Sequence, residues 1–167
     1  EKHRLIANSD SFNKKRYAKL INFILMPNHF HLTVCQIKNG GISKYLQRVQ
    51  NAYTKYYNSK YDLSGHLFQG PYRLVRVTSN EQLLHLSAYI HYNCRDIARS
   101  WCGREEKYYW SSLTDYVDRN RWGRLIKPQV VMNQFVDAGD YNEFIMKSGV
   151  KKIDIDPFPV KTNKTHN

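Results

Sequence analysis

Two histidines separated by a single residue are the first side chains of this sequence that could do chemistry together. His29 and His31 lie on either side of Phe30. Side chains of a β-strand alternate between its two faces, so both imidazoles would project from one face, roughly 7 Å apart, and Phe30 from the other. Two imidazoles placed in this way can share a metal ion. The alternative is a pair of half-exposed polar side chains with no ligand.

A second group of polar side chains has helical spacing. At about 100° per residue, four side chains of residues 80–93 fall on one narrow stripe: Gln82, His85, Tyr89 and Asn93. Tyr89 and Asn93 are four positions apart, so a phenol and an amide oxygen would lie one above the other. The alternative is a polar helix face in water, with Tyr89 at the edge of the core.

The two groups together could cut a phosphodiester bond. A divalent cation needs more than two protein ligands, and the amide oxygen of Asn93 could join His29 and His31 as the third. Such a cation could polarise a phosphodiester oxygen while the phenol of Tyr89 attacks phosphorus. This chemistry requires the strand and the helix to meet, which spacing alone cannot show.

The elements that must position these side chains begin with a predicted hairpin. Residues 17–26 and 29–37 are typical of strands and flank Pro27 and Asn28, a turn pair, so we expect them to pair antiparallel. Residues 42–58 have helical periodicity. We expect this helix to pack on the sheet through one apolar stripe: Ile42, Leu46, Val49, Tyr53 and Tyr56.

Further along the chain, residues 67–77 are predicted to be a strand that is bulged at Gly70 and Pro71. Thr78 and Glu81 form a capping box for a helix that should run to about Asn93. Shorter helices are expected near 112–118, 128–136 and 140–148. The fold class is therefore α+β, with one domain over residues 1–149 and a loosely ordered tail over 150–167.

Charge favours a nucleic-acid partner. The 167 residues contain 26 Lys and Arg against 14 Asp and Glu, a net charge of +12, together with 13 Tyr. Cations can follow phosphates and rings can stack on bases, although a merely basic protein has the same composition. The chain begins with Glu1 and not Met, so we expect an N-terminal piece to be absent.

Other protein classes are disfavoured. No apolar run approaches the ~20 residues that span a bilayer, and no signal-peptide pattern opens the chain. Cys35, Cys94 and Cys102 are odd in number and have no Cys-x-x-Cys spacing, which argues against a disulfide scaffold or a cysteine zinc site. We therefore expect a reducing compartment, the cytoplasm.

Five sequence blocks in a fixed order resemble the single-tyrosine HUH transposases, in particular their REP-associated, transposase-like branch. The blocks are LMPNHFHL, GGISKYLQRVQNAYTKYYN, SGHLFQG, LSAYIHYN and YYWSS, and the resemblance runs from about Asn22 to Tyr116. It implies a ferredoxin-like antiparallel sheet with packed helices. It also implies that His29, His31 and Asn93 bind magnesium or manganese and that Tyr89 is the nucleophile.

Members of this family cut single-stranded DNA beside a folded hairpin. The tyrosine becomes joined to the 5′-phosphate, a free 3′-hydroxyl is left, and the strand can later be rejoined. This chain departs from the family in two places. Cys94 replaces a Pro, which we expect to loosen the end of the helix. Nothing before residue 17 is typical of a strand, so we expect the family's first strand to be missing.

Six cations near the proposed site are candidates for DNA binding: Lys44, Arg48, Lys55, Arg73, Arg76 and Arg95. His66, Phe68 and Tyr72 could stack on unpaired bases, although core packing is an alternative for the last two. His85 could assist Tyr89, but a structural or DNA-contacting role is the favoured interpretation.

The sequence thus predicts a metal-dependent endonuclease and strand transferase for single-stranded DNA with a hairpin. The alternatives are a non-catalytic module that binds DNA or RNA hairpins and a metallohydrolase in which the histidines activate water. Both a monomer and a homodimer stay open. Of the other tyrosines, Tyr53 and Tyr56 should be buried against the sheet, and Tyr57 has a tyrosine, not an amide, four positions on.

Overall fold

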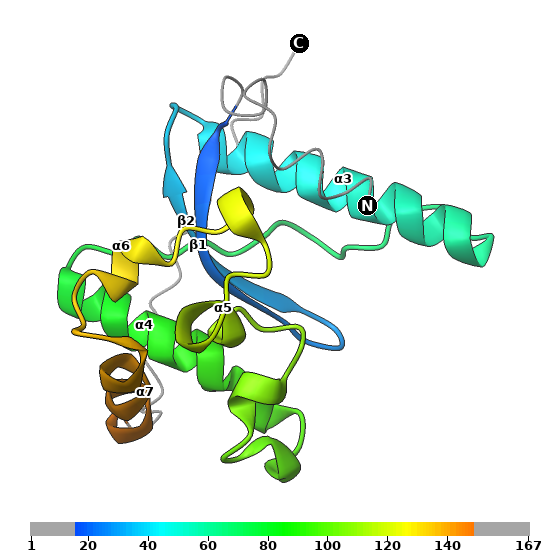
Figure 1. Cartoon of the computed structure of the whole chain (residues 1–167). Helices are drawn as coiled ribbons and strands as arrows, with labels where there is room; N and C mark the ends of the chain where they lie inside the picture. Colours follow the sequence, from blue (N-terminus) through cyan, green and yellow to red (C-terminus); the bar gives the residue numbers. More distant parts are fainter. Residues whose placement is uncertain (1–15, 149–167) are drawn as a thin grey trace.

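A two-stranded antiparallel hairpin lies at the centre of the structure, a computed structural model that describes residues 16–148 (Figure 1). Strand β1 (Ala18–Leu25) pairs with β2 (Phe30–Gln36), with Ile24 opposite His31 and Asn22 opposite Thr33. The predicted hairpin is confirmed, because Pro27 cannot continue the ladder and the chain reverses there.

Later segments of the chain cover the other edge of β1. The amide of Lys127 donates to the carbonyl of Leu20 (2.8 Å), and the amide of Ser112 donates to that of Phe23 (2.9 Å). Single bridges join Leu20 to Ile126 and Ile24 to Ser111. These contacts satisfy backbone groups that an exposed edge strand would leave open.

The predicted strand at 67–77 is wrong. This segment runs as an extended loop in which Leu74 alone forms a bridge. Gly70 adopts a positive φ of 73°, and Pro71 has no amide proton to give to a ladder, which together interrupt pairing. The loop is fixed instead by side chains, since the Tyr72 hydroxyl lies 2.8 Å from Ser43 Oγ.

Helix α3 (Gly41–Tyr61) is flanked by Gly40 as its N-cap, with a φ of 64°, and by Asp62 as its C-cap, with a φ of 52°. The prediction that its apolar stripe packs on the sheet is wrong beyond Leu46, which is buried. Tyr53 and Tyr56 are 48% and 58% exposed. The physical reason is that α3 extends past the hairpin, so only its first half has a sheet to cover (Figure 1).

Helix α4 (Asn80–Tyr92) continues as a 3-10 turn over Asn93–Asp96. Its N-cap is Ser79 and not the predicted Thr78: Ser79 Oγ accepts from the Gln82 amide at 3.0 Å, and Gln82 Oε1 accepts from the Thr78 amide at 2.7 Å. The capping interaction is thus shifted by one residue, because Gln82 replaces Glu81 as the reciprocal partner.

Short helices complete the described chain and surround α4 (Figure 1). They are α5 (Leu113–Val117), α6 (Gln129–Met132) and α7 (Ala138–Lys147), with 3-10 turns at Arg99–Trp101, Glu105–Lys107 and Gly123–Leu125. All three helices were predicted, but α6 is shorter than 128–136. None of the helices in residues 16–148 is long and apolar enough to cross a bilayer.

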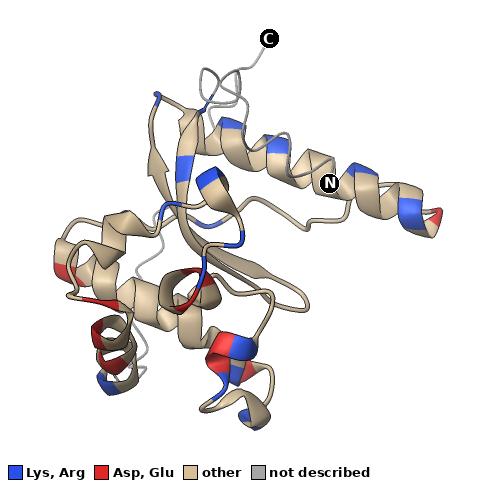
Figure 2. Ribbon diagram, in the orientation of Figure 1, with Lys and Arg blue, Asp and Glu red and all other residues tan. Residues whose placement is uncertain are grey.

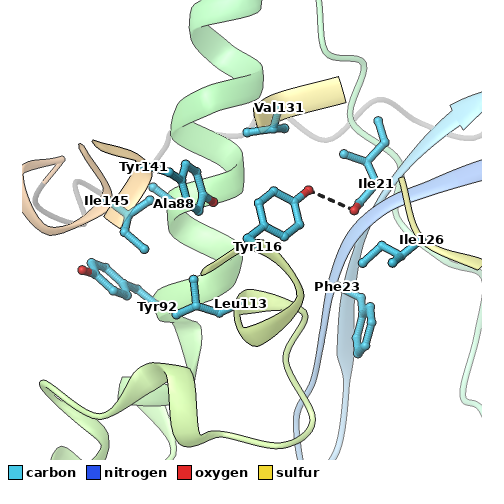
Figure 3. Close-up of a cluster of buried hydrophobic side chains, with 10 residues drawn as sticks. All are labelled: Ile21, Phe23, Ala88, Tyr92, Leu113, Tyr116, Ile126, Val131, Tyr141 and Ile145. Carbon is cyan, nitrogen blue, oxygen red and sulfur yellow. Dashed lines mark hydrogen bonds between the residues drawn. The ribbon is translucent and has the colours of Figure 1, made fainter. Parts of the chain in front are cut away.

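The core joins β1 to α4, α5 and α7. Ile21 and Phe23 pack with Ala88 and Tyr92, together with side chains of the short helices that Figure 3 labels. The predicted α+β class is confirmed. The expected absence of a first strand and the expected loose tail at 150–167 concern residues outside the described ones.

Candidate active site

Strand β2 and helix α4 meet, as the proposed chemistry requires. Asn22 of β1 donates from Nδ2 to Ser87 Oγ of α4 at 2.9 Å, and Ile24 packs on Ile90 in a buried cluster. These contacts fix α4 on one face of the hairpin. They bring the Tyr89 ring to His31, with the ring centroids 5.6 Å apart and the planes at 76°.

The two histidines lie together on that face. Their ring centroids are 4.9 Å apart and nearly perpendicular. Phe30 points to the other face, where it contacts Phe68 at 5.9 Å. The Nδ1 of His29 lies 2.7 Å from Asn28 Oδ1, which can only accept, and donation from Nδ1 in a neutral ring would leave Nε2 as the nitrogen that can face a metal ion.

Electrostatics favour a neutral imidazole at His31. Burial lowers its pKa below the usual value, the neighbouring His29 lowers it further, and the carboxylate of Asp96 partly opposes both effects. A metal ligand must offer a lone pair, so a lowered pKa keeps His31 competent to bind a cation at neutral pH.

Asn93 has an unsatisfied oxygen. Its side chain is buried, and Nδ2 donates to Asp96 Oδ2 at 3.2 Å, but no partner in the described part of the chain reaches the buried Oδ1. A buried acceptor without a donor costs about 1–3 kcal/mol, so the position is unfavourable unless a donor or a cation meets it. A ligand role would remove that cost.

Asp96 is the residue of the candidate site that sequence reasoning missed. It fixes the amide of Asn93 and acts electrostatically on His31. Its position three residues after Asn93, about one helical turn, was the available signal.

The donor set fits a divalent cation. Two imidazoles, an amide oxygen and a nearby carboxylate combine nitrogen and oxygen donors, which suits a cation that DNA phosphates would also coordinate. Among residues 16–148, His, Cys, Asp and Glu alone form no group of three that could hold a metal ion. A site with three protein ligands here would therefore need the amide of Asn93.

Comparison with known proteins identifies the family of this chain. The model of the family described as "Transposase IS200 like" matches residues 2–93, more than half of the chain. The chain belongs to the IS200-like transposase family. The matched region contains His29, His31, Tyr89 and Asn93. Neither a curated protein nor a solved structure matches the chain.

Membership of this family supports a transposase-like function on DNA, and the surface of this IS200-like transposase carries suitable cations. Arg73 and Arg76 are exposed on the loop before α4. Lys44, Arg48 and Lys55 are exposed along α3, where Figure 2 shows a row of basic residues. The guanidinium of Arg48 lies 4.8 Å from the Tyr17 ring centroid.

Unlike the other five predicted DNA-binding residues, Arg95 pairs with a buried carboxylate in the described part of the chain. Its guanidinium lies 3.8 Å from the Tyr92 ring centroid and pairs with the buried carboxylate of Glu105. The structure therefore gives Arg95 a role in holding the segment after α4.

His85 lies one turn before Tyr89 on α4, and its side chain contacts α7 and the start of α4. Its ring contacts Phe144 of α7 at 5.7 Å, and its Nε2 lies 3.9 Å from Glu81. These contacts fit the structural role more closely than assistance to Tyr89. Of the proposed stacking residues, Phe68 packs between Phe30 and Tyr53, and His66 is exposed.

Proposed function

We propose that this IS200-like transposase is a metal-dependent endonuclease and strand transferase for single-stranded DNA, acting beside a hairpin through a 5′-phosphotyrosine intermediate. The observation that carries the proposal is the contact between the Tyr89 ring and His31, which joins a nucleophile to a pair of metal ligands. The cytoplasm is its proposed location.

In the proposed reaction, the Tyr89 oxygen loses its proton and attacks phosphorus. The bond from phosphorus to the 3′-oxygen breaks, and that oxygen leaves as a 3′-hydroxyl after taking a proton. Attack by a 3′-hydroxyl on the phosphotyrosine reverses the step and rejoins DNA. Because one phosphodiester replaces another, the energy of the broken bond is retained for rejoining.

Magnesium or manganese would supply Lewis-acid polarisation of a phosphate oxygen when bound. His29, His31 and Asn93 are the residues proposed to hold it. Asp96 orients the Asn93 amide by accepting from Nδ2, which leaves Oδ1 for the cation. Tyr89 is only partly buried, so its ring is accessible to a DNA strand.

The test is covalent capture of DNA by Tyr89. The wild-type chain, incubated with hairpin-flanked oligonucleotides and manganese, should give a protein–DNA adduct on a denaturing gel. Tyr89→Phe removes only the nucleophilic oxygen, so it should bind DNA with nearly unchanged affinity and form no adduct. Tyr109→Phe, a matched change at an exposed tyrosine, should form the adduct normally.

The same gel separates the alternatives. Binding without cleavage would indicate a non-catalytic hairpin-binding module, and cleavage without an adduct would indicate a metallohydrolase. Peptide mapping should find the nucleotide on the peptide that contains Tyr89. An adduct mapped to residues 53–57 would overturn the assignment.

A further inference from the structure

The outer side of α3 carries two parallel stripes that the proposed catalytic site does not use. At about 100° per residue, Lys44, Arg48 and Lys55 lie on one line along the helix. Val49, Tyr53 and Tyr56 lie on a second line, and we call the latter two the tyrosine face. Members of both stripes are exposed.

Small side chains separate the two stripes. Ala52 and Ser59 fall between them on the helical wheel and are themselves exposed. Because these side chains are short, they leave a shallow strip between the row of cations and the row of rings. Lys60 adds a positive charge beside the rings, with Nζ 5.8 Å from the Tyr56 ring centroid. A strand could therefore place its phosphates on one side of this strip and its bases on the other.

The tyrosine face is held in place by a series of ring contacts. Tyr53 contacts Tyr56 with a centroid distance of 6.4 Å and Phe68 with one of 6.1 Å, and Phe68 contacts Phe30 of β2. The rings are thus positioned by the hairpin although they face solvent. A positioned ring loses little conformational freedom when a base stacks on it.

Charge decides which partner fits. Helix α3 contains no Asp or Glu between Gly41 and Tyr61. An apolar protein partner would leave the cations of the first stripe buried without counter-charges, which is costly. A nucleic-acid strand supplies a negative charge for each cation and a flat base for each ring.

We propose that the outer side of α3 binds unpaired nucleic acid, with phosphates on Lys44, Arg48 and Lys55 and bases stacked on the tyrosine face. The inference rests on the proposed function in one respect: that function supplies the occupant, the single strand beside the DNA hairpin. From Lys44 to Lys55 the helix rises ~16 Å, about five nucleotides at 3.4 Å per phosphate.

The test measures the affinity for a labelled thymidine oligonucleotide of about ten nucleotides at several salt concentrations. The double variant Tyr53→Ala/Tyr56→Ala should weaken binding at least about fivefold without changing the salt slope, because stacking releases no counterions. The double variant Lys44→Gln/Lys55→Gln should reduce the slope by about 1.4. Tyr109→Ala and Lys147→Gln, at exposed sites outside α3, are the matched controls and should bind like wild type.

An abasic oligonucleotide of the same length isolates the stacking. On this probe the tyrosine variant should bind like wild type, whereas the lysine variant should still be weaker. Tyr56→Leu keeps an apolar side chain and removes the ring, so it replaces the alanine variant if that variant does not fold.

Three results would overturn the proposal. The first is an unchanged affinity of the tyrosine variants for the oligonucleotide, and the second is an equal loss of their affinity for the abasic strand. The third is a tyrosine variant that binds the oligonucleotide normally but no longer self-associates in sedimentation. The last would assign the face to a second copy of the chain. Failure of the proposed function is separate, because it appears as a missing Tyr89 adduct in a chain that still binds the oligonucleotide through α3.

Discussion

At the scale of single residues, the site depends most on His31, which contacts both His29 and Tyr89. His31→Ala should abolish adduct formation with manganese, because two protein ligands are too few to retain the cation. Calorimetric titration with manganese should show binding weakened by about tenfold or more, with an unchanged circular dichroism spectrum. His85→Ala is the control and should bind manganese normally. A His31→Ala variant that forms adducts in the presence of a chelator would contradict the metal assignment.

Which side chains share a face of their own element could be predicted from the sequence, but that the strand and the helix meet, and how the side chains are oriented, could not be predicted from spacing. Alternation placed the two histidines on one face, and helical spacing placed Tyr89 above Asn93. The orientation of Asn93 depends on its hydrogen bond to Asp96, beyond the end of α4, where regular spacing no longer applies. The ion pair of Arg95 could not be predicted for a related reason, because its partner Glu105 lies ten residues away in an irregular segment.

At the scale of the elements, α4 carries Tyr89, the proposed nucleophile, and its first turn depends on Ser79. Ser79→Ala removes the acceptor for the Gln82 amide and should lower the free energy of unfolding by about 1 kcal/mol. Thermal or urea unfolding would measure this. Ser100→Ala, at an exposed serine in a 3-10 turn, is the control and should change stability little. An unchanged stability of Ser79→Ala would show that Gln82 alone caps the helix.

Local signals predicted the hairpin and α4 because their apolar residues are buried as the periodicity requires. They failed at 67–77, where apolar residues contact neighbouring side chains without forming a ladder. They also failed on the tyrosine face, where an apolar stripe indicates burial by default. Whether another element covers a stripe is a property of the tertiary structure, and α3 extends past the hairpin, the one sheet within residues 16–148.

At the scale of the whole molecule, one buried network connects the hairpin, α4 and α7. The Nδ1 of His91 lies 2.7 Å from the Tyr141 hydroxyl, and its Nε2 lies 2.9 Å from Ser112 Oγ. Ser112 Oγ in turn accepts from the Phe23 amide of β1, and Tyr141 contacts Ser87 Oγ at 2.8 Å. A neutral imidazole, with one donor and one acceptor, therefore links strand, helix and C-terminal segment.

This network predicts sensitivity of the fold to acid. Burial lowers the pKa of His91 to about 3, whereas in the unfolded chain it is near 6.5. Between these values the unfolded chain binds a proton that the folded chain does not, so stability falls as the pH falls below about 6.5, by roughly 1 kcal/mol per pH unit. Above that pH the His91 contribution is constant. Urea unfolding at pH 7, 6 and 5 should show the decline.

His91→Gln tests the cause. Glutamine does not titrate, so the slope between pH 6.5 and 5 should become shallower, although stability at pH 7 should drop because one of the two hydroxyl partners loses its bond. His66→Gln, at an exposed histidine, is the control and should keep the wild-type slope. If the free energy of unfolding of His91→Gln falls with pH as steeply as that of wild type, the acid sensitivity comes from other groups. The His91 imidazole would then not be the group that couples the β-hairpin to the helices that hold Tyr89.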